Sequence, residues 1–243
     1  AIAVSGSDVY IGGDFTDAMG NPGSNYILRY NQKNNTWHSL LSGLNGPVHV
    51  IAVSGNDVYV GGEFTDAGGN LDADRIARWD GSSWSALGTG MNNPVHALAV
   101  SGTNLYAGGG FTTAGGVTVN RIARWDGNSW HALGAGMGGL FPYVSALAVS
   151  GSDLYVGGWF TTAGGKVSPY LARAVLDLQP PLTPIPLQWQ LQNQQLVLSW
   201  TDAGFQLQAA PEATGTYTNV PNATSPYTNP LTGPRRFFRL HAP

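Results

Sequence analysis

The fold is decided by residues 48–62, Val-His-Val-Ile-Ala-Val-Ser-Gly-Asn-Asp-Val-Tyr-Val-Gly-Gly, because nearly the same sequence occurs three more times in the chain. The tyrosine that the four copies share recurs every 47 to 49 residues, at Tyr10, Tyr59, Tyr106 and Tyr155. Each copy has an apolar run, a Ser-Gly turn and a second apolar run ending in Gly-Gly, which predicts a β-hairpin. A period of this length with strand-like segments is typical of a β-propeller blade.

The rest of each copy predicts two further strands. In the second copy a polar, glycine-rich loop is followed by an apolar run at 75–79, an Asp80-Gly81 turn and another run at 83–87. Asp-Gly between alternating apolar runs is a strong hairpin signal. One copy therefore predicts four antiparallel strands, named A to D in chain order.

Counting these segments predicts an all-β protein with a β-propeller of about four four-stranded blades and about fifteen strands. The first copy begins inside strand A, so a processed or truncated start is expected, and the last copy lacks strand D. Three arrangements remain open: a four-bladed ring, an open arc closed by a second chain, and a fragment of a larger ring. An open arc would expose a hydrophobic blade face and a strand edge, which favours a homo-oligomer that completes the ring.

Residues present in every copy are expected to be structural. The Gly-Gly pairs are expected to allow close backbone approach, and Trp37, Trp84 and Trp130 are expected to fill the gaps between sheets. One arginine per copy is expected to brace loops or blades, at Arg29, Arg78, Arg124 and Arg173. Specificity should therefore come from positions where the copies differ.

Residues 1 to about 176 resemble the kelch repeat, with the closest match at residues 29–40, Arg-Tyr-Asn-Gln-Lys-Asn-Asn-Thr-Trp-His-Ser-Leu. Kelch-type propellers include oxidases, lyases and many binding proteins, so the resemblance implies a fold and no single activity. The words Phe-Thr-x-Ala-Gly-Gly and Arg-Trp-Asp-Gly are similar to repeat arrays of secreted bacterial proteins. The cysteine that kelch-type copper oxidases need is missing here.

The predicted domains are the propeller repeats at 1–178, a Pro-rich linker at 179–186 and a small β-sandwich-like module at 187–243. The last segment has short alternating strands and resembles the C-terminal immunoglobulin-like module of large secreted proteins from environmental bacteria. That resemblance implies a secreted or cell-surface location.

Composition excludes several classes of function. The net charge of −3 and only two lysines give no basic field for nucleic acid. No apolar run approaches the roughly 20 residues of a membrane helix, so no membrane span is expected. The absence of cysteine removes thiolate nucleophiles and cysteine-type zinc sites. Nucleophile-elbow, P-loop, dinucleotide and His-Glu-x-x-His motifs are also missing.

The long B–C loops (14–25, 63–74, 110–120, 159–169) and the D–A loops (41–47, 88–94, 134–143) are expected on one face. Two positions there vary between copies: His49, His96 and Ser145 near the start of strand A, and Asp14, Glu63, Gly110 and Trp159 after the double glycine.

These side chains support two functional hypotheses. A divalent metal, zinc or calcium, could be held by His49, His96, Asp14, Glu63 and Asp66, with Asp17, Asp72 and Asp74 as further oxygen donors. Its catalytic residues would be His49, His96, Glu63 and Asp14, in a hydrolase of esters, lactones or phosphotriesters. The competing interpretation is solvated carboxylates and hydrogen-bonded histidines.

The other hypothesis is a binding or scaffolding propeller. Trp159, Phe141 and Tyr143 would be exposed anchors for a glycan, protein or small-molecule ligand. A purely structural surface array, which needs no site, is the third possibility.

Overall fold

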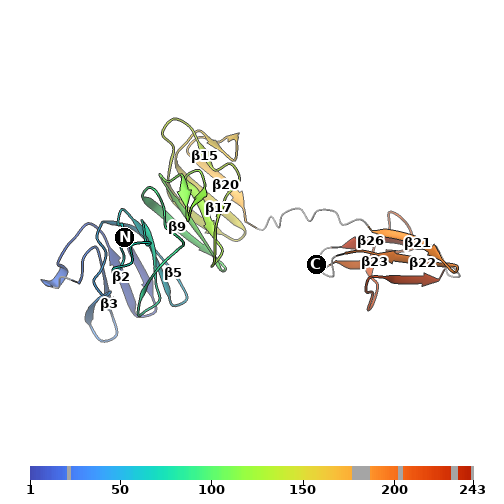
Figure 1. The fold of residues 1–243 in the computed structure, drawn as a ribbon, viewed down its shortest axis with the longest axis horizontal. Helices are drawn as coiled ribbons and strands as arrows, with labels where there is room; N and C mark the ends of the chain where they lie inside the picture. Colours follow the sequence, from blue (N-terminus) through green and yellow to red (C-terminus); the bar gives the residue numbers. More distant parts are fainter. Residues whose placement is uncertain (21–22, 177–186, 202–204, 231–234, 242–243) are drawn as a thin grey trace. The chain divides into compact units, whose positions relative to one another are not determined.

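The computed structural model describes the chain except for residues 21–22, 177–186, 202–204, 231–234 and 242–243. The chain divides into two compact units, Ala1–Leu176 and Asp177–Pro243 (Figure 1). The regular structure of the described residues is β, apart from one 3-10 turn, η1 (Ala18–Gly20). None of these residues forms a helix with the length and apolarity needed to cross a membrane. The linker expected at 179–186 lies outside the described residues.

The first unit contains four antiparallel sheets, one from each copy of the repeat. The first sheet is made of β1 (Ile2–Ser5), β2 (Asp8–Gly12), β3 (Ile27–Asn31) and β4 (Thr36–Ser39). The second is made of β5 (Val48–Ser54), β6 (Asp57–Gly62), β7 (Ile76–Trp79) and β8 (Trp84–Ala86). The third is made of β9 (Val95–Ser101), β10 (Asn104–Gly109), β13 (Ile122–Trp125) and β14 (Trp130–Ala132). The fourth has three strands, β16 (Tyr143–Ser150), β17 (Asp153–Trp159) and β20 (Leu171–Val175).

Short strands in the long loops of the third and fourth sheets form two further small sheets. One pairs β11 (Thr113–Ala114) with β12 (Val117–Thr118), and the other joins β15 (Met137–Gly138), β18 (Thr162–Ala163) and β19 (Lys166–Val167). Together with the four sheets they confirm the predicted all-β propeller architecture, and the described residues of the last copy form strands A to C.

The Asp-Gly turns form because the aspartate carboxylate accepts hydrogen bonds from backbone amides of the turn. The Asp80 carboxylate accepts hydrogen bonds from the backbone amides of Ser82 and Ser83, both at 2.8 Å. These bonds favour the ionised form and hold the pKa of Asp80 well below its usual range. A turn fixed in this way joins strands C and D of the second sheet.

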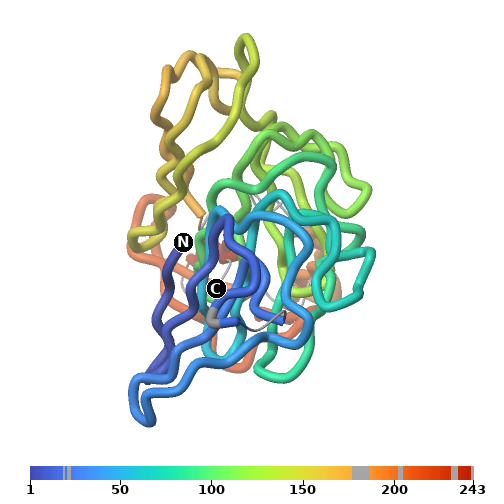
Figure 2. The backbone as a smooth tube through the Cα atoms, turned by 90° about the vertical axis from the view of Figure 1, so that its left-hand side faces the viewer, coloured from blue at the N-terminus to red at the C-terminus, as the bar shows by residue number. Residues whose placement is uncertain are grey.

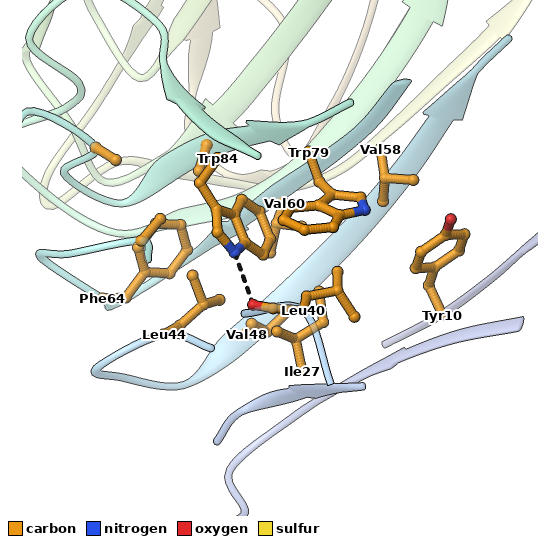
Figure 3. Close-up of a cluster of buried hydrophobic side chains, with 13 residues drawn as sticks. Tyr10, Ile27, Leu40, Leu44, Val48, Val58, Val60, Phe64, Trp79 and Trp84 are labelled. Carbon is orange, nitrogen blue, oxygen red and sulfur yellow. Dashed lines mark hydrogen bonds between the residues drawn. The ribbon is translucent and has the colours of Figure 1, made fainter. Parts of the chain in front are cut away.

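Neighbouring sheets pack through apolar side chains (Figure 3). Tyr10 and Ile27 of the first sheet meet Val58, Val60 and Trp79 of the second in one buried cluster. Burying each such side chain contributes roughly 1.5–3 kcal/mol. The hydrophobic effect between sheets, and not within one sheet, therefore holds this unit together.

The strand-D tryptophans tie each sheet to the one before it. The indole Nε1 of Trp84 donates a hydrogen bond to the Leu40 carbonyl of the first sheet at 3.1 Å. Trp130 repeats the bond with Leu87 at 2.8 Å. The prediction for Trp37 was wrong: its side chain is 45% exposed and packs on Tyr30 of its own sheet. No sheet of the described residues packs on this side of the first sheet.

The four sheets form an open array. They follow one another in chain order, from blue through green to yellow (Figure 1), and Figure 2 shows the same succession of hairpins in the backbone. The first sheet packs on β5, the second on β9 and the third on β16, whereas the described residues of the first and fourth sheets form no comparable packing. This unit is thus an arc and not a self-closed four-bladed ring.

The second unit has two three-stranded sheets. One contains β21 (Gln188–Gln192), β22 (Gln195–Ser199) and β25 (Tyr227–Pro230). The other contains β23 (Gln206–Ala210), β24 (Thr218–Asn219) and β26 (Phe237–His241). Both sheets contribute to a small core around Leu198, Trp200 and Leu207, which gives a β-sandwich-like unit.

Candidate functional site

A β-bulge in the innermost strand of three sheets sets the direction of one side chain. The register shifts between Val48 and Val50, at the Gly108–Gly109 step opposite residue 96, and between Val144 and Ala146. His49, His96 and Ser145 occupy the extra positions. A bulged residue is released from the ladder and its side chain can be re-aimed. The repeat therefore carries one freely variable residue per sheet at this end.

The structure brings four of the predicted site residues together. His49 Nε2 lies 3.0 Å from Glu63 Oε1, within the same sheet. The His49 and His96 rings from neighbouring sheets lie 5.2 Å apart between centroids, tilted by 43°. Tyr143 of the fourth sheet meets His96 edge-on at 6.5 Å. A polar and aromatic ladder thus crosses the second, third and fourth sheets.

This ladder disfavours charge on its central histidine. Partial burial lowers the pKa of His96 below its ordinary value of 6.5, and the adjacent His49 lowers it further, while Glu63 opposes both effects. The lowered pKa favours the neutral form of His96. A neutral imidazole can donate one hydrogen bond, accept another, or coordinate a metal.

The predicted metal ligands do not all come together at one site. Asp66 accepts a hydrogen bond from the Gly69 amide at 2.6 Å and closes its own loop. Asp14 follows β2 in the first sheet. Among the residues that the structure describes, no group of three or more histidine, aspartate or glutamate side chains has the geometry to hold a metal ion. The bond from His49 to Glu63 is the one ligand pair in hydrogen-bond contact, and the metal centre stays a prediction.

A second cluster lies in the long loops of the fourth sheet. Leu140, Phe141, Trp159, Phe160, Thr161 and Tyr170 line a hollow of about 350 Å³, here called the aromatic hollow. The apolar side chains at its rim are highly exposed, since Leu140 is 78% and Phe141 82% exposed. The rings of Trp159 and Tyr170 lie 5.6 Å apart and form one wall.

Two predicted anchors, Trp159 and Phe141, meet in the aromatic hollow, whereas Tyr143 faces His96. Tyr170 was missed by the sequence analysis. It takes the repeat position of Arg75 and Arg121, which share its positive φ and its backbone bond to the preceding phenylalanine. Alignment of the copies at that position would have identified it.

Two residues of the aromatic hollow have positive φ values. Phe141 has φ 54° and Tyr170 has φ 67°, in the left-handed region that bulky side chains rarely adopt. The Tyr170 amide donates to the Phe160 carbonyl at 3.0 Å, which fixes this conformation. The Tyr170 ring is thus positioned by backbone bonds, although 56% of the residue is exposed.

The chain matches one family model and is similar to several solved structures. Residues 1–139 match the family model described as the Rax2 C-terminal beta propeller domain. No curated protein matches. The computationally designed Ika8 protein is 17% identical with a TM-score of 0.47, over 84% of this chain and 55% of its own. The designed Ika4 protein is 16% identical, TM-score 0.48, over 72% and 89%. The RRP9 WD40 repeats are 14% identical, TM-score 0.48, over 82% and 58%.

The chain thus spans just over half the length of Ika8 and of the RRP9 WD40 structure. The family match supports the β-propeller but does not extend to kelch repeats or to an immunoglobulin-like module. Because it covers more than half of the sequence, the chain belongs to the Rax2 C-terminal β-propeller domain family.

Proposed function

We propose that this chain is a protein-binding propeller module, and that the aromatic hollow of the fourth sheet receives an apolar side chain of a partner. The observation that carries the proposal is the exposure of Leu140 and Phe141 around a hollow of about 350 Å³. Exposed apolar residues that surround a hollow favour a ligand that removes them from water. A β-propeller is consistent with such a binding or scaffolding role.

The lining favours a protein over a glycan. Of its six side chains, only Thr161 and Tyr170 carry a hydroxyl, so a sugar would find few hydrogen-bond partners. Aromatic anchors in a small pocket are typical of binding hot spots between proteins. A glycan ligand is the outcome that the test below must distinguish.

A displayed library of random peptides, selected on the whole chain, tests this function. We expect enrichment of peptides with a large apolar residue, and a loss of about tenfold or more in affinity for Trp159→Ser, a change of ~1.4 kcal/mol. Val167→Ser is the matched control, because Val167 is exposed in the same loop and outside the lining. Signal on a glycan array that vanishes in Trp159→Ser, with no peptide enriched, would refute the protein form of the proposal.

A metal-dependent hydrolase is the second candidate, favoured by the contact of His49 with Glu63 beside His96. Two histidines and one carboxylate are ligand types that zinc accepts, although the three side chains do not have metal-binding geometry in this structure. Titration of the purified protein with zinc, followed by calorimetry, should then show one site that His96→Ala removes. Hydrolysis of an activated ester that is unaffected by a chelator and by His49→Ala would eliminate this candidate.

We also propose that the chain works outside the cell or at its surface. The support is the resemblance of residues 187–243 to the immunoglobulin-like modules of secreted proteins, and of the Phe-Thr-x-Ala-Gly-Gly and Arg-Trp-Asp-Gly motifs to repeat arrays of secreted bacterial proteins. External protease treatment of intact source cells should remove the protein from the cell fraction, or the culture medium should contain it. Complete protection inside intact cells would contradict this placement.

A further inference from the structure

The two ends of the arc expose apolar surfaces whose equivalents elsewhere in the first unit are buried or partly buried between sheets. The face of each sheet toward the next sheet is called its far face, and the opposite face its near face. Ile27, Ile76 and Ile122 take the same far-face position in the first three sheets, and each is completely buried. Leu171 takes that position in the fourth sheet and is 64% exposed.

The shared tyrosine shows the same change. Tyr106 of the third sheet is 3% exposed because it packs with Leu154 and Val156 of the fourth. Its equivalent in the fourth sheet, Tyr155, is 38% exposed. The fourth sheet thus repeats the docking face of its predecessors without the neighbour.

The first glycine of each Gly-Gly pair confirms that space is left for a neighbour. A Cβ added to Gly61 would lie 2.6 Å from Val95 Cγ1 of the next sheet. At Gly157 of the fourth sheet the nearest atom is Ala146 Cβ of its own sheet, at 3.7 Å. The space that receives the next sheet in the other copies is therefore present at Gly157 of the fourth sheet, and no described side chain of another sheet fills it.

The near face of the first sheet is the matching surface. Ile2 is 70% exposed, whereas Leu98 at the same repeat position of the third sheet is 7% exposed and packs against Ile76. Val4 is 60% exposed, and its equivalent Val53 packs with the first sheet. Ile2 and Val4 are apolar, like the near-face residues that pack against a far face at the three contacts between sheets within the chain.

We propose that a second copy of this chain covers both surfaces, with the far face of each fourth sheet on the near face of the other copy's first sheet. Every contact between sheets in the chain joins a far face to a near face, so the two open faces are already complementary. Such head-to-tail contacts give a ring if the rotation closes. Two copies supply eight sheets, within the roughly four to eight of known propellers, whereas three copies would exceed that range.

The side chains that would meet at this contact are apolar, so their burial favours the association and single charged substitutions should break it. The inference is independent of the aromatic hollow and its ligand.

Light scattering of the whole chain after size exclusion measures the outcome. We expect a mass of twice the 25.5 kDa chain, and a return to 25.5 kDa for Leu171→Arg and for Ile2→Arg. Leu71→Arg is the matched control: Leu71 is a leucine with 76% exposure in a loop, and this variant should remain dimeric. Unchanged circular dichroism shows that each variant folds.

Mixing the two variants tests the head-to-tail geometry. In a dimer of either variant alone both contacts carry an arginine, whereas a mixed dimer keeps one contact free of substitution. The mixture should therefore recover dimer that neither variant forms alone. A monomeric wild-type chain at micromolar concentration overturns the proposal and leaves these faces to another occupant, such as further repeats of a longer chain. A dimer unaffected by both arginines, or no recovery on mixing, overturns it equally.

Discussion

Replacing Gly108 by alanine tests how the sheets pack against one another. The added Cβ would lie 2.4 Å from Val144 Cγ1 and 3.0 Å from Val144 Cβ, both in the next sheet. Ordinary carbon contacts lie near 3.5–4.0 Å, so Val144 must retreat by about 1 Å. Val144 is completely buried and has no free space to enter.

The expected cost follows from two opposing effects. Overpacking in a close-packed core costs roughly 1–3 kcal/mol, and the loss of glycine entropy from the unfolded chain returns about 0.4–1 kcal/mol. Gly108→Ala should therefore lower the free energy of unfolding by about 1–2 kcal/mol. Gly110→Ala is the control, because its Cβ would meet only Asn93 Cβ at 4.0 Å, and other copies place Asp14 or Glu63 there.

Urea unfolding followed by tryptophan fluorescence measures the difference, since six of the eight tryptophans lie in the first unit. Gly110→Ala should unfold at the wild-type midpoint or slightly above it. Equal midpoints for Gly108→Ala and Gly110→Ala, whether unchanged or lowered by the same amount, would refute the close approach of the third and fourth sheets.

Two further predictions concern the tryptophans and the histidine ladder. Trp130→Phe removes the indole donor of the Leu87 carbonyl, which keeps a longer bond of 3.4 Å from the Gly90 amide, and should cost about 0.5–1.5 kcal/mol in a urea titration. Trp37→Phe on the exposed near face should cost less than about 0.5 kcal/mol, and similar losses would contradict the interpretation. The pKa of His96 in the folded chain is below 6.5, so the unfolded chain binds the proton first and stability should fall as pH drops through about 6.5 toward the folded value. An NMR titration of the His96 ring that gives a pKa above 6.5, or an acid sensitivity that His96→Gln does not reduce, would contradict this.

The repeat predicted the fold well because it combines several local signals that agree. The hairpins, the Asp-Gly turns and strands A to C of the last copy were all read from spacing and turn chemistry, which act within one sheet. Trp37 was interpreted wrongly because its environment depends on a neighbour outside its own copy. A repeat predicts what each sheet contains, but its end members have different surroundings from the rest.

The candidate site was only partly predictable for a related reason. Trp159 and Phe141 could be found as loop aromatics, and His49 and Glu63 as variable residues on one face. Tyr170 was missed because its repeat position holds a structural arginine in two other copies: Arg121 reaches the Pro142 carbonyl of the next sheet at 3.1 Å. Only the structure shows that Tyr170 has no such neighbour to reach and turns toward Trp159 instead.

The bulges at residues 49, 96 and 145 have a consequence for engineering. A side chain at these positions lies outside the buried apolar clusters between the sheets, so its identity can change with little change in the scaffold. The chain already shows this tolerance, with two imidazoles and one hydroxyl in equivalent places. A library randomised only at these three positions would vary the recognition surface while the folding energy stayed nearly constant, which makes the arc a ready frame for designed receptors.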